Sequence, residues 1–437
     1  MYKDPNEHPF YRLYRQLDST EKKFFGRYIE QLPGTDQKQY LLALSPRRAG
    51  VAIPCNAESY LLGHLQRFLR SFRAGSPRVE IMNHITNAEN LFLRRLPHLA
   101  LVEITKAEGI CLAYEFLEEE LVVLSWTQKL KANLLMFDQA EAAAHAVMDN
   151  LRKSEALYAQ NLGSSKINFL FDNYDQQPMA DFVLGLQRAQ LPLASETLTT
   201  REAIINQLLC GKTSLILGDA AIAKSCLQQA WTLLSTHQLI RLSNPLLTLE
   251  VADWLSQFGL LWAEPDLLAA VEQELASTQF LSPGNDVRRQ AKLARIGLLR
   301  QYLDPANHSP IDIKQDLIDQ DPELFILRAL ADRSDKGTSR NIRQLNQLLS
   351  GGNIVGTALM RKLLRLELLL HARQGDDIYC RSRLKSYQRR YAVNLSHNIE
   401  ERTELEAFRQ HINGQPKPTF VPTRLHLLYF GFGLTLA

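Results

Sequence analysis

Residues 211–238 read GKTSLILGDAAIAKSCLQQAWTLLSTHQ, and this stretch sets the expectation for the fold. Gly218 and Asp219 give a tight-turn signal between two short helical segments. After the turn, apolar side chains recur at the i, i+4, i+7, i+8 and i+11 spacing of one helix face: Ala223, Leu227, Ala230, Trp231 and Leu234. Two short helices cannot bury such a face alone. We therefore expect a neighbouring pair to cover it, as in helical-repeat proteins.

Similar helical patterns continue on both sides of this pair. The spacing predicts nearly continuous helix over 79–160, a less regular region over 161–200 broken by Gly163-Ser164-Ser165, and a last clear pair at 357–373 and 377–391. The turn of that last pair contains Gly375-Asp376, which repeats the Gly218-Asp219 signal. Strand signals are nearly absent. The sequence predicts an all-α fold, a right-handed α-solenoid of degenerate tetratricopeptide-like (TPR-like) helical pairs with an N-terminal helical region.

Composition is typical of a folded protein with several helical segments. We expect a basic N-terminal helical region at 1–96, a first helical-repeat segment with an irregular end at 97–195, a second at 196–414, and a tail at 415–437. The chain has 437 residues, 45% of them hydrophobic and 22% charged. No apolar run is long enough to span a bilayer, and the N-terminus lacks the apolar core of a signal peptide.

The cysteines are odd in number and widely spaced, which favours reduced thiols and a cytoplasmic protein. They are Cys55, Cys111, Cys210, Cys226 and Cys380. Charge is unevenly distributed behind the formal net value of +3. Residues 1–100 carry a net charge of +6 and residues 335–395 carry +8, whereas residues 101–334 carry −11. The simplest explanation is that these charged residues lie unevenly over a solvent-exposed surface. The more specific interpretation is that the two basic regions contact anionic partners.

Several segments resemble, in order, an uncharacterised family of TPR-like helical-repeat proteins common in Bacteroidota. The first segment, at 17–25, reads LDSTEKKFF and is similar to the family's [SD]-x-x-E-[KR]-[RK]-[YF]-F start. YLLGHLQRFL at 60–69, the Trp126, Lys129 and Leu130 positions, and 381–391 resemble later family helices. The tail beyond Gly414 departs from the family. The resemblance implies a repeat fold in a bacterial cytoplasmic protein and supplies no catalytic residues.

Motifs for catalysis, metals or cofactors are weak. Gly211-Lys212-Thr213-Ser214 imitates the end of a phosphate-binding loop, but Asn206 stands where the first glycine belongs and a helix precedes it. The glycine-rich segment 351–356 lacks a following Lys and fits an interhelical connection. The histidines, including His64 and His371, form no zinc-ligand spacing and fit helix packing. The acidic run 118–120 fits the N-terminus of a helix. We expect no enzyme activity, no metal and no cofactor.

The candidate partner-binding residues lie in the later basic region. Arg361 and Arg365 stand at i and i+4 on one predicted helix, and Arg381, Lys385 and Arg389 stand at i, i+4 and i+8 on the next. Guanidinium groups bind carboxylates and phosphates bidentately, so a groove lined this way suits an acidic peptide or a nucleic-acid backbone. A solvated face beside an acidic neighbour is the simpler alternative. Nearby Tyr387 and Tyr391 fit either a stacking platform or the core.

Two functions of different classes follow from these observations. The first is a non-enzymatic protein–protein interaction scaffold, an α-solenoid that binds a peptide or partner protein. The alternative is a nucleic-acid-associated regulatory protein that uses its basic helical surfaces. The tail 425–437, LHLLYFGFGLTLA, is too short to span a bilayer as a helix, and we expect it to dock against the last helices.

Overall fold

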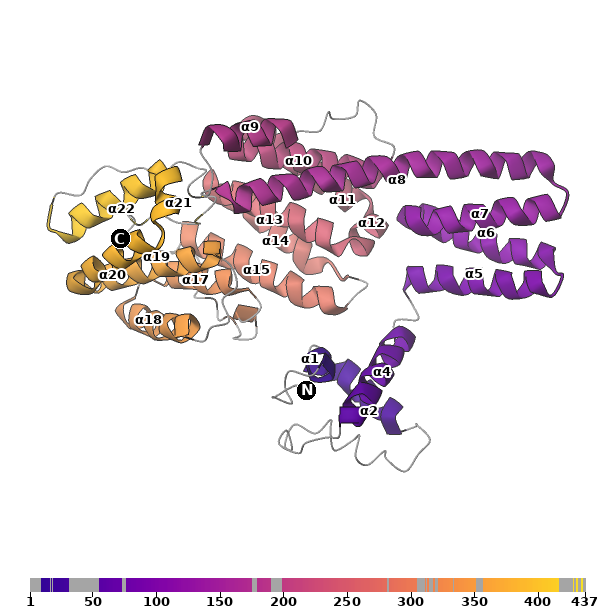
Figure 1. Ribbon diagram of the computed structural model, residues 1–437, viewed down its shortest axis with the longest axis horizontal. Helices are drawn as coiled ribbons and strands as arrows, with labels where there is room; N and C mark the ends of the chain where they lie inside the picture. Colours follow the sequence, from indigo (N-terminus) through magenta and orange to yellow (C-terminus); the bar gives the residue numbers. More distant parts are fainter. Residues whose placement is uncertain are drawn as a thin grey trace. The chain divides into compact units, whose positions relative to one another are not determined.

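The computed structural model describes residues 9–15, 17, 19–30, 55–72, 76–174, 179–189, 199–280, 283–304, 311, 313, 317–318, 321–332, 334–350, 357–415, 427, 430 and 434. Within these residues it contains 20 helices and no strand, which confirms the predicted all-α class (Figure 1). The chain divides into two compact units, Met1–Arg152 with Leu281–Asp286 and Lys153–Phe280 with Val287–Ala437. The segment boundaries predicted from sequence breakers remain predictions.

The described residues of the N-terminal region form a small cluster of helices, α1 (Pro9–Arg15), α2 (Ser19–Glu30) and α4 (Cys55–Phe72). Apolar side chains at helical spacing meet in its core: Phe10, Leu17, Phe25, Ile29, Leu61, Leu65 and Phe68. The rings of Phe25 and Phe68 lie 5.3 Å apart, within the range of favourable aromatic pairs. The helix predicted over 37–44 lies outside the described residues.

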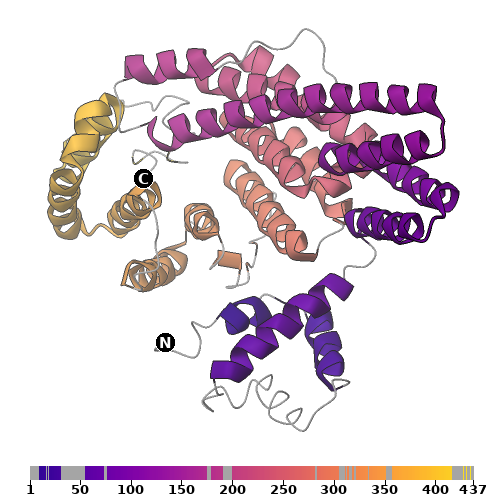
Figure 2. The same ribbon diagram turned by 45° about the vertical axis from the view of Figure 1, so that its right-hand side comes forward.

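Three helices of similar length follow in the first unit: α5 (Pro77–Leu93), α6 (Pro97–Tyr114) and α7 (Leu117–Asn133). Consecutive helices run antiparallel beside one another (Figures 1 and 2). Arg95 and Glu115 adopt positive φ angles of 63° and 50° in the two connections, a left-handed conformation that commonly ends helices. The short turns hold the apolar faces of the three helices together. Ile81, Ile104 and Val123, one from each helix, accordingly lie in one core.

Helix α8 (Phe137–Asp172) begins in the first unit and ends in the second, and it corrects the sequence prediction. We expected a break at Gly163-Ser164-Ser165, but the helix continues through them. A helical glycine costs only about 1 kcal/mol relative to Ala, which packing can offset. Gly163 is buried, and Ser164 accepts a hydrogen bond from the Lys212 amino group at 3.4 Å. The small residues therefore allow a neighbouring side chain to approach rather than end the helix.

The pair predicted from residues 211–238 is confirmed as α10 (Thr200–Leu217) and α11 (Ala220–Thr236). Gly218 ends α10 with φ of +87°, and the Asp219 side chain caps α11 by accepting a hydrogen bond from the Ile222 N–H at 3.2 Å. The predicted apolar face is buried at Ala223, Leu227, Ala230 and Leu234, while Trp231 is half-buried. The sequence signal therefore located both the turn and the packed face.

The second unit continues with helices that pack against their neighbours in the chain. After α9 (Met179–Ala189), α10 and α11 come α12 (Gln238–Ser243), α13 (Pro245–Leu261), α14 (Pro265–Ser277), α15 (Pro283–Leu303), α17 (Pro322–Ala331), α18 (Asp335–Ser350), α19 (Thr357–Arg373), α20 (Asp377–Arg390), α21 (Ala392–His397) and α22 (Ile399–Ile412). Contacts join α11 to α13, α13 to α14, α18 to α19, and α19 to α20. Among the described helices, none has both the length and the apolar content that crossing a bilayer demands.

The second Gly-Asp turn predicted from the sequence is confirmed between α19 and α20. Gly375 adopts φ of +72°, and the Asp376 side chain accepts a hydrogen bond from the Tyr379 N–H at 3.2 Å. Glycine avoids the Cβ clash of this left-handed conformation, and aspartate satisfies a free N–H group of the next helix. The same two residue types therefore position two hairpins of the second unit.

Candidate functional site

The two predicted arginines of α19 are buried, and this corrects the expectation that they line a groove. Arg361 and Arg365 are both 0% exposed. Arg361 donates to the Glu401 carboxylate, and Arg365 donates to Glu404 at 2.5 Å. The four side chains bring two positive and two negative charges into one cluster, so the buried charges compensate each other.

Further contacts enclose this cluster on α19, α20 and α22. The Tyr387 hydroxyl donates to Glu401 at 2.6 Å, and burial together with the Glu401 charge raises the pKa of Tyr387 well above its ordinary value. Burial alone lowers the pKa of Arg365, but Glu404 and Glu401 raise it overall. Both groups therefore keep their donor protons at neutral pH. The spacing of the two arginines was predictable, but their burial depends on Glu401 and Glu404, which lie 40 and 39 residues further along the chain.

Part of the C-terminal tail docks on the same cluster. The ring of Phe430 lies 4.0 Å from the Arg365 guanidinium carbon, a cation–π arrangement, and the Leu434 N–H donates to Glu404 at 2.6 Å. Both residues are buried. The prediction that the tail docks against the last helices is confirmed for Phe430 and Leu434. The tail therefore adds contacts to a charge cluster that is already internal.

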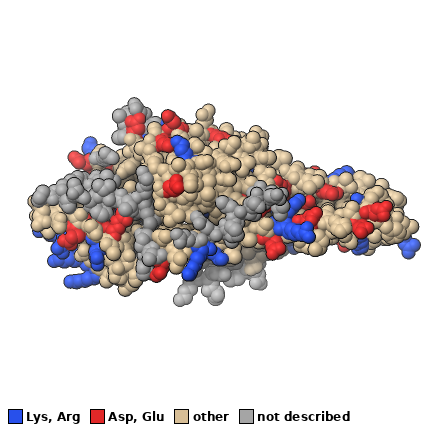
Figure 3. All heavy atoms as spheres, turned by 90° about the horizontal axis from the view of Figure 1, so that it is seen from above, with Lys and Arg blue, Asp and Glu red and all other residues tan. Residues whose placement is uncertain are grey.

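The three predicted cations of α20 are exposed, unlike those of α19. Arg381, Lys385 and Arg389 point to solvent and form no ion pair with the residues that the structure describes. We call these three side chains the α20 basic face. Figure 3 shows basic side chains gathered at the end of the unit that holds the C-terminal helices. Arg390 of the same helix is also exposed, although the sequence analysis did not select it. Arg383, by contrast, forms an ion pair with Glu367 at 2.7 Å, which sequence spacing could not reveal.

A small hollow lies beside the α20 basic face. It is lined by Leu364, Arg383, Ser386, Tyr387 and Arg390, and its volume is about 30 Å³. That space holds a water molecule or two and is far below the few hundred Å³ of a typical ligand pocket. The hollow beside these cations is therefore too small for a cofactor-sized ligand.

The apparent phosphate-binding motif lies inside a helix, as the sequence context indicated. Gly211-Lys212-Thr213-Ser214 belongs to α10, and Lys212 is 0% exposed. Its amino group forms an ion pair with Glu250 and donates to Asn168 at 3.2 Å. Burial lowers the pKa of Lys212, an effect that Glu250 partly offsets. The lysine is held by protein groups and presents no loop of free N–H groups to a phosphate.

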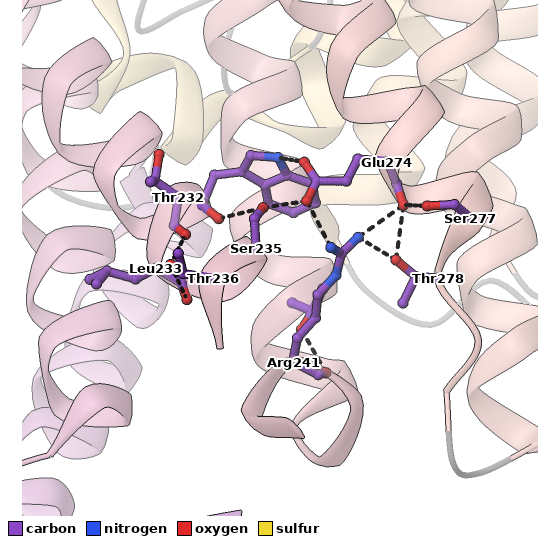
Figure 4. Close-up of polar contacts among 10 residues, drawn as sticks. Thr232, Leu233, Ser235, Thr236, Arg241, Glu274, Ser277 and Thr278 are labelled. Carbon is purple, nitrogen blue, oxygen red and sulfur yellow. Dashed lines mark hydrogen bonds and ion pairs between the residues drawn. The ribbon is translucent and has the colours of Figure 1, made fainter. Parts of the chain in front are cut away.

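A polar cluster that sequence spacing missed joins α11, α12 and α14 (Figure 4). Both carboxylate oxygens of Glu274 accept hydrogen bonds, one from the Trp231 ring N–H at 2.5 Å and one from Arg241 at 2.7 Å. Arg241 also donates to the Glu274 carbonyl at 2.9 Å and to the Thr278 hydroxyl. The contributing residues come from three helices, so no local sequence motif could predict the cluster. Because its donors and acceptors bind one another, we interpret this cluster as a structural clamp.

The other side chains singled out by sequence have packing roles. His64 is buried and shares a hydrogen bond of 3.2 Å with Tyr28, and burial followed by the Arg67 charge lowers its pKa. His371 stacks on Tyr379 with ring centroids 3.9 Å apart. Glu118, Glu119 and Glu120 open α7 as predicted. Residues 351–356 lie outside the described part of the chain, and the described residues contain no cluster suited to a metal ion.

Comparisons of this chain with protein-family models, with curated proteins and with solved structures gave no match. The family resemblance noted in the sequence therefore stays a prediction. The site rests on its own geometry: an internal, neutralised arginine cluster on α19 and an outward, uncompensated basic face on α20.

Proposed function

We propose that this chain is a non-enzymatic interaction scaffold, a right-handed α-solenoid of TPR-like helical pairs that binds an acidic peptide segment of a partner protein. The α20 basic face is the observation that carries the proposal. Arg381, Lys385 and Arg389 share one exposed stripe without acidic partners among the described residues, whereas Lys212, Arg361 and Arg365 are neutralised inside the unit. The partner's carboxylates supply the charge that this face lacks.

Charge alone is too weak for a stable complex, and this limits the kind of partner. An exposed ion pair contributes about 0.2–1 kcal/mol, so three pairs give at most about 3 kcal/mol, below the roughly 4 kcal/mol of a millimolar complex. Ile378, three residues before Arg381, and Val393, four residues after Arg389, are 81% and 73% exposed. We expect apolar side chains of the partner to cover these two residues, with acidic side chains between them. The partner class is therefore an acidic segment with apolar anchors.

The alternative, a nucleic-acid-associated regulator, draws on the same exposed cations and on the basic excess of residues 1–100. Binding of single strands gains much of its energy from bases that stack on exposed aromatic rings. Tyr387 and Tyr391, the tyrosines at the C-terminal end of α20, are both only 3% exposed, and the half-buried ring of Tyr379 already stacks on His371. Stacking at α20 is thus disfavoured, and we favour the peptide. Reduced cysteines are consistent with a cytoplasmic setting for either function.

The test is a titration of a fluorescein-labelled peptide rich in Glu and Leu, followed by anisotropy at low and at physiological salt. The Arg381→Glu, Lys385→Glu, Arg389→Glu triple variant is expected to weaken binding about tenfold or more. A matched triple variant, Arg288→Glu, Lys336→Glu and Arg343→Glu, changes the same charge at exposed positions elsewhere in the unit and is expected to bind normally.

Three outcomes contradict the proposal: no binding to the wild-type chain, equal losses in both triple variants, or tighter, steeply salt-dependent binding of a labelled single-stranded oligonucleotide. The last outcome supports the nucleic-acid alternative.

A further inference from the structure

The backbones of α10 and α11 approach very closely around Gly211. A Cβ atom at this position would lie 2.6 Å from the Leu227 side chain and 3.3 Å from the Leu227 backbone nitrogen. Glycine is therefore required here for the two helices to touch. The adjacent residues on the two helices are Cys210 and Cys226, which occupy the same level of the hairpin.

The two thiols face each other across this contact. Their sulfur atoms lie 3.1 Å apart, with Cys226 donating to Cys210. A disulfide has a sulfur–sulfur bond of about 2.05 Å and needs closely spaced backbones, so a shift of about 1 Å would complete the bond. Both residues are half-buried and reachable, whereas Cys111 and Cys380 are fully buried on other helices. Among the described cysteines, this pair alone combines proximity with access.

We propose that Cys210 and Cys226 are a reversible redox modification site, which forms an intramolecular disulfide between α10 and α11 when a small-molecule disulfide is the oxidant. In the first step the Cys210 thiolate attacks one sulfur of the oxidant and releases one reduced thiol. In the second step the Cys226 sulfur loses its proton, attacks the Cys210 sulfur, and releases the second reduced thiol. The protein thus loses two electrons and two protons, and the oxidant gains them.

The environment of the pair assigns the order of attack. Burial, and then the hydrogen bond to Cys210, raise the pKa of the Cys226 thiol to about 12. Cys226 therefore stays protonated and donates to Cys210, so we assign the first attack to Cys210 and the second to Cys226. The link would close the α10–α11 hairpin covalently at the level where its helices are closest. Because the cross-link restricts the unfolded chain, the oxidised protein is expected to melt at a higher temperature.

The test uses the full chain, fully reduced and then incubated with oxidised glutathione. Thiol titration in denaturant is expected to fall from the five cysteines of the sequence to three, with a monomeric band on a non-reducing gel. Trypsin cleaves after Arg201, Lys212, Lys224 and Arg241, so a denatured digest places the two cysteines on different peptides. Mass spectrometry is expected to find 202–212 joined to 225–241, and reduction should separate them.

Variants make the result specific to this geometry. Cys226→Ser should leave Cys210 as a stable mixed disulfide with glutathione, and Cys380→Ala should form the wild-type link. Gly211→Ala should slow the link by forcing the helices apart, while Gly109→Ala, where a Cβ meets nothing within 4 Å, should not. Circular dichroism confirms that each variant is folded. The proposal is overturned if all five thiols survive oxidation, if the linked peptides contain other cysteines, or if the product is an intermolecular dimer.

Discussion

The α10–α11 and α19–α20 hairpins use the same turn and a similar internal cation, yet they differ in how charge is compensated. Each first helix ends at a glycine with positive φ, and each second helix begins with an aspartate cap. Lys212 of α10 pairs with Glu250, whose side chain is 33% exposed, whereas Arg361 and Arg365 of α19 pair with Glu401 and Glu404, which are 0% exposed. A shared local motif thus positions helices without deciding their electrostatics.

The second helices differ as well. Lys224 of α11 forms an ion pair of 2.6 Å with Glu264, the residue just before α14, but Arg381, Lys385 and Arg389 of α20 have no such partner among the described residues. Both helices pack against neighbours, but an acidic residue lies beside Lys224, whereas the side of α20 that carries Arg381, Lys385 and Arg389 faces solvent. An arginine stripe is therefore structural where a later helix places acidic side chains against it, and it is free to bind a partner where no helix does.

The largest expected effect is at the fully buried cluster. Arg365→Met leaves Glu404 without its buried counter-charge, while Glu401 keeps Arg361, and it should destabilise the second unit by about 3–5 kcal/mol. The double variant Arg365→Met, Glu404→Met removes the unpaired charge and should recover much of the loss. Calorimetric melting measures both, with the exposed Arg381→Met as control. A loss no larger than that of the control would contradict the internal role of Arg365.

A smaller effect is expected at the half-exposed pair of the first hairpin. Lys212→Met keeps the side-chain volume but leaves Glu250, which is 33% exposed and can regain water. The expected destabilisation is about 1–3 kcal/mol, mainly from lost hydrogen bonds to Ser164 and Asn168. Lys224→Met, with a surface pair, is the matched comparison and should cost about 1 kcal/mol or less. If Lys212→Met proves as damaging as Arg365→Met, the contrast between the two hairpins is wrong.

The pH dependence of stability should reveal the carboxylate that links α15, α17 and α19. Glu323 accepts from Lys362 at 2.6 Å and from Arg295 at 2.9 Å, and these two charges, Lys362 first, hold its pKa well below the ordinary 4.5. A depressed carboxylate pKa stabilises the fold above about pH 4.5, and this contribution is lost as pH falls toward the folded-state pKa.

The measurement for Glu323 is the melting temperature of wild-type protein and Glu323→Gln across a pH series. The side chain is 31% exposed, so solvent screening limits the difference to about 1 kcal/mol near neutral pH. The difference between the two proteins should shrink as pH drops below 4.5. A constant difference over the whole series would show that the ion pairs are not its source.

The smallest effect on stability is expected at the α20 basic face. The Arg381→Glu, Lys385→Glu, Arg389→Glu variant alters exposed side chains that hold no described partner, so its stability should stay within about 0.5 kcal/mol of wild type per position. The repulsion among the three positive side chains is exchanged for a similar repulsion among three negative ones, so the net electrostatic change is small. A large fall in melting temperature would place these residues in the structural class of Arg365.

The sequence was most informative where a structure depends on neighbouring residues. Gly218 with Asp219, Gly375 with Asp376, and the Ala223-to-Leu234 face were all predictable, because turns, caps and helix periodicity are local. The continuation of α8 through Gly163 was not, since the contacts of this segment, such as that between Lys212 and Ser164, come from another helix. The burial of Arg361 was missed for the same reason. Spacing tells which residues share a helix face, whereas the partner of that face, Glu401, lies on α22.

The central claim is that the cations of α20 bind a partner while those of α19 hold the fold. The most direct measurement is the anisotropy titration of the labelled acidic, Leu-containing peptide with wild-type chain and with the Arg381→Glu, Lys385→Glu, Arg389→Glu variant, both checked to have the same melting temperature. The partner-binding role of the α20 basic face predicts a fully folded variant whose affinity falls about tenfold or more. Unchanged affinity in a folded variant would contradict it.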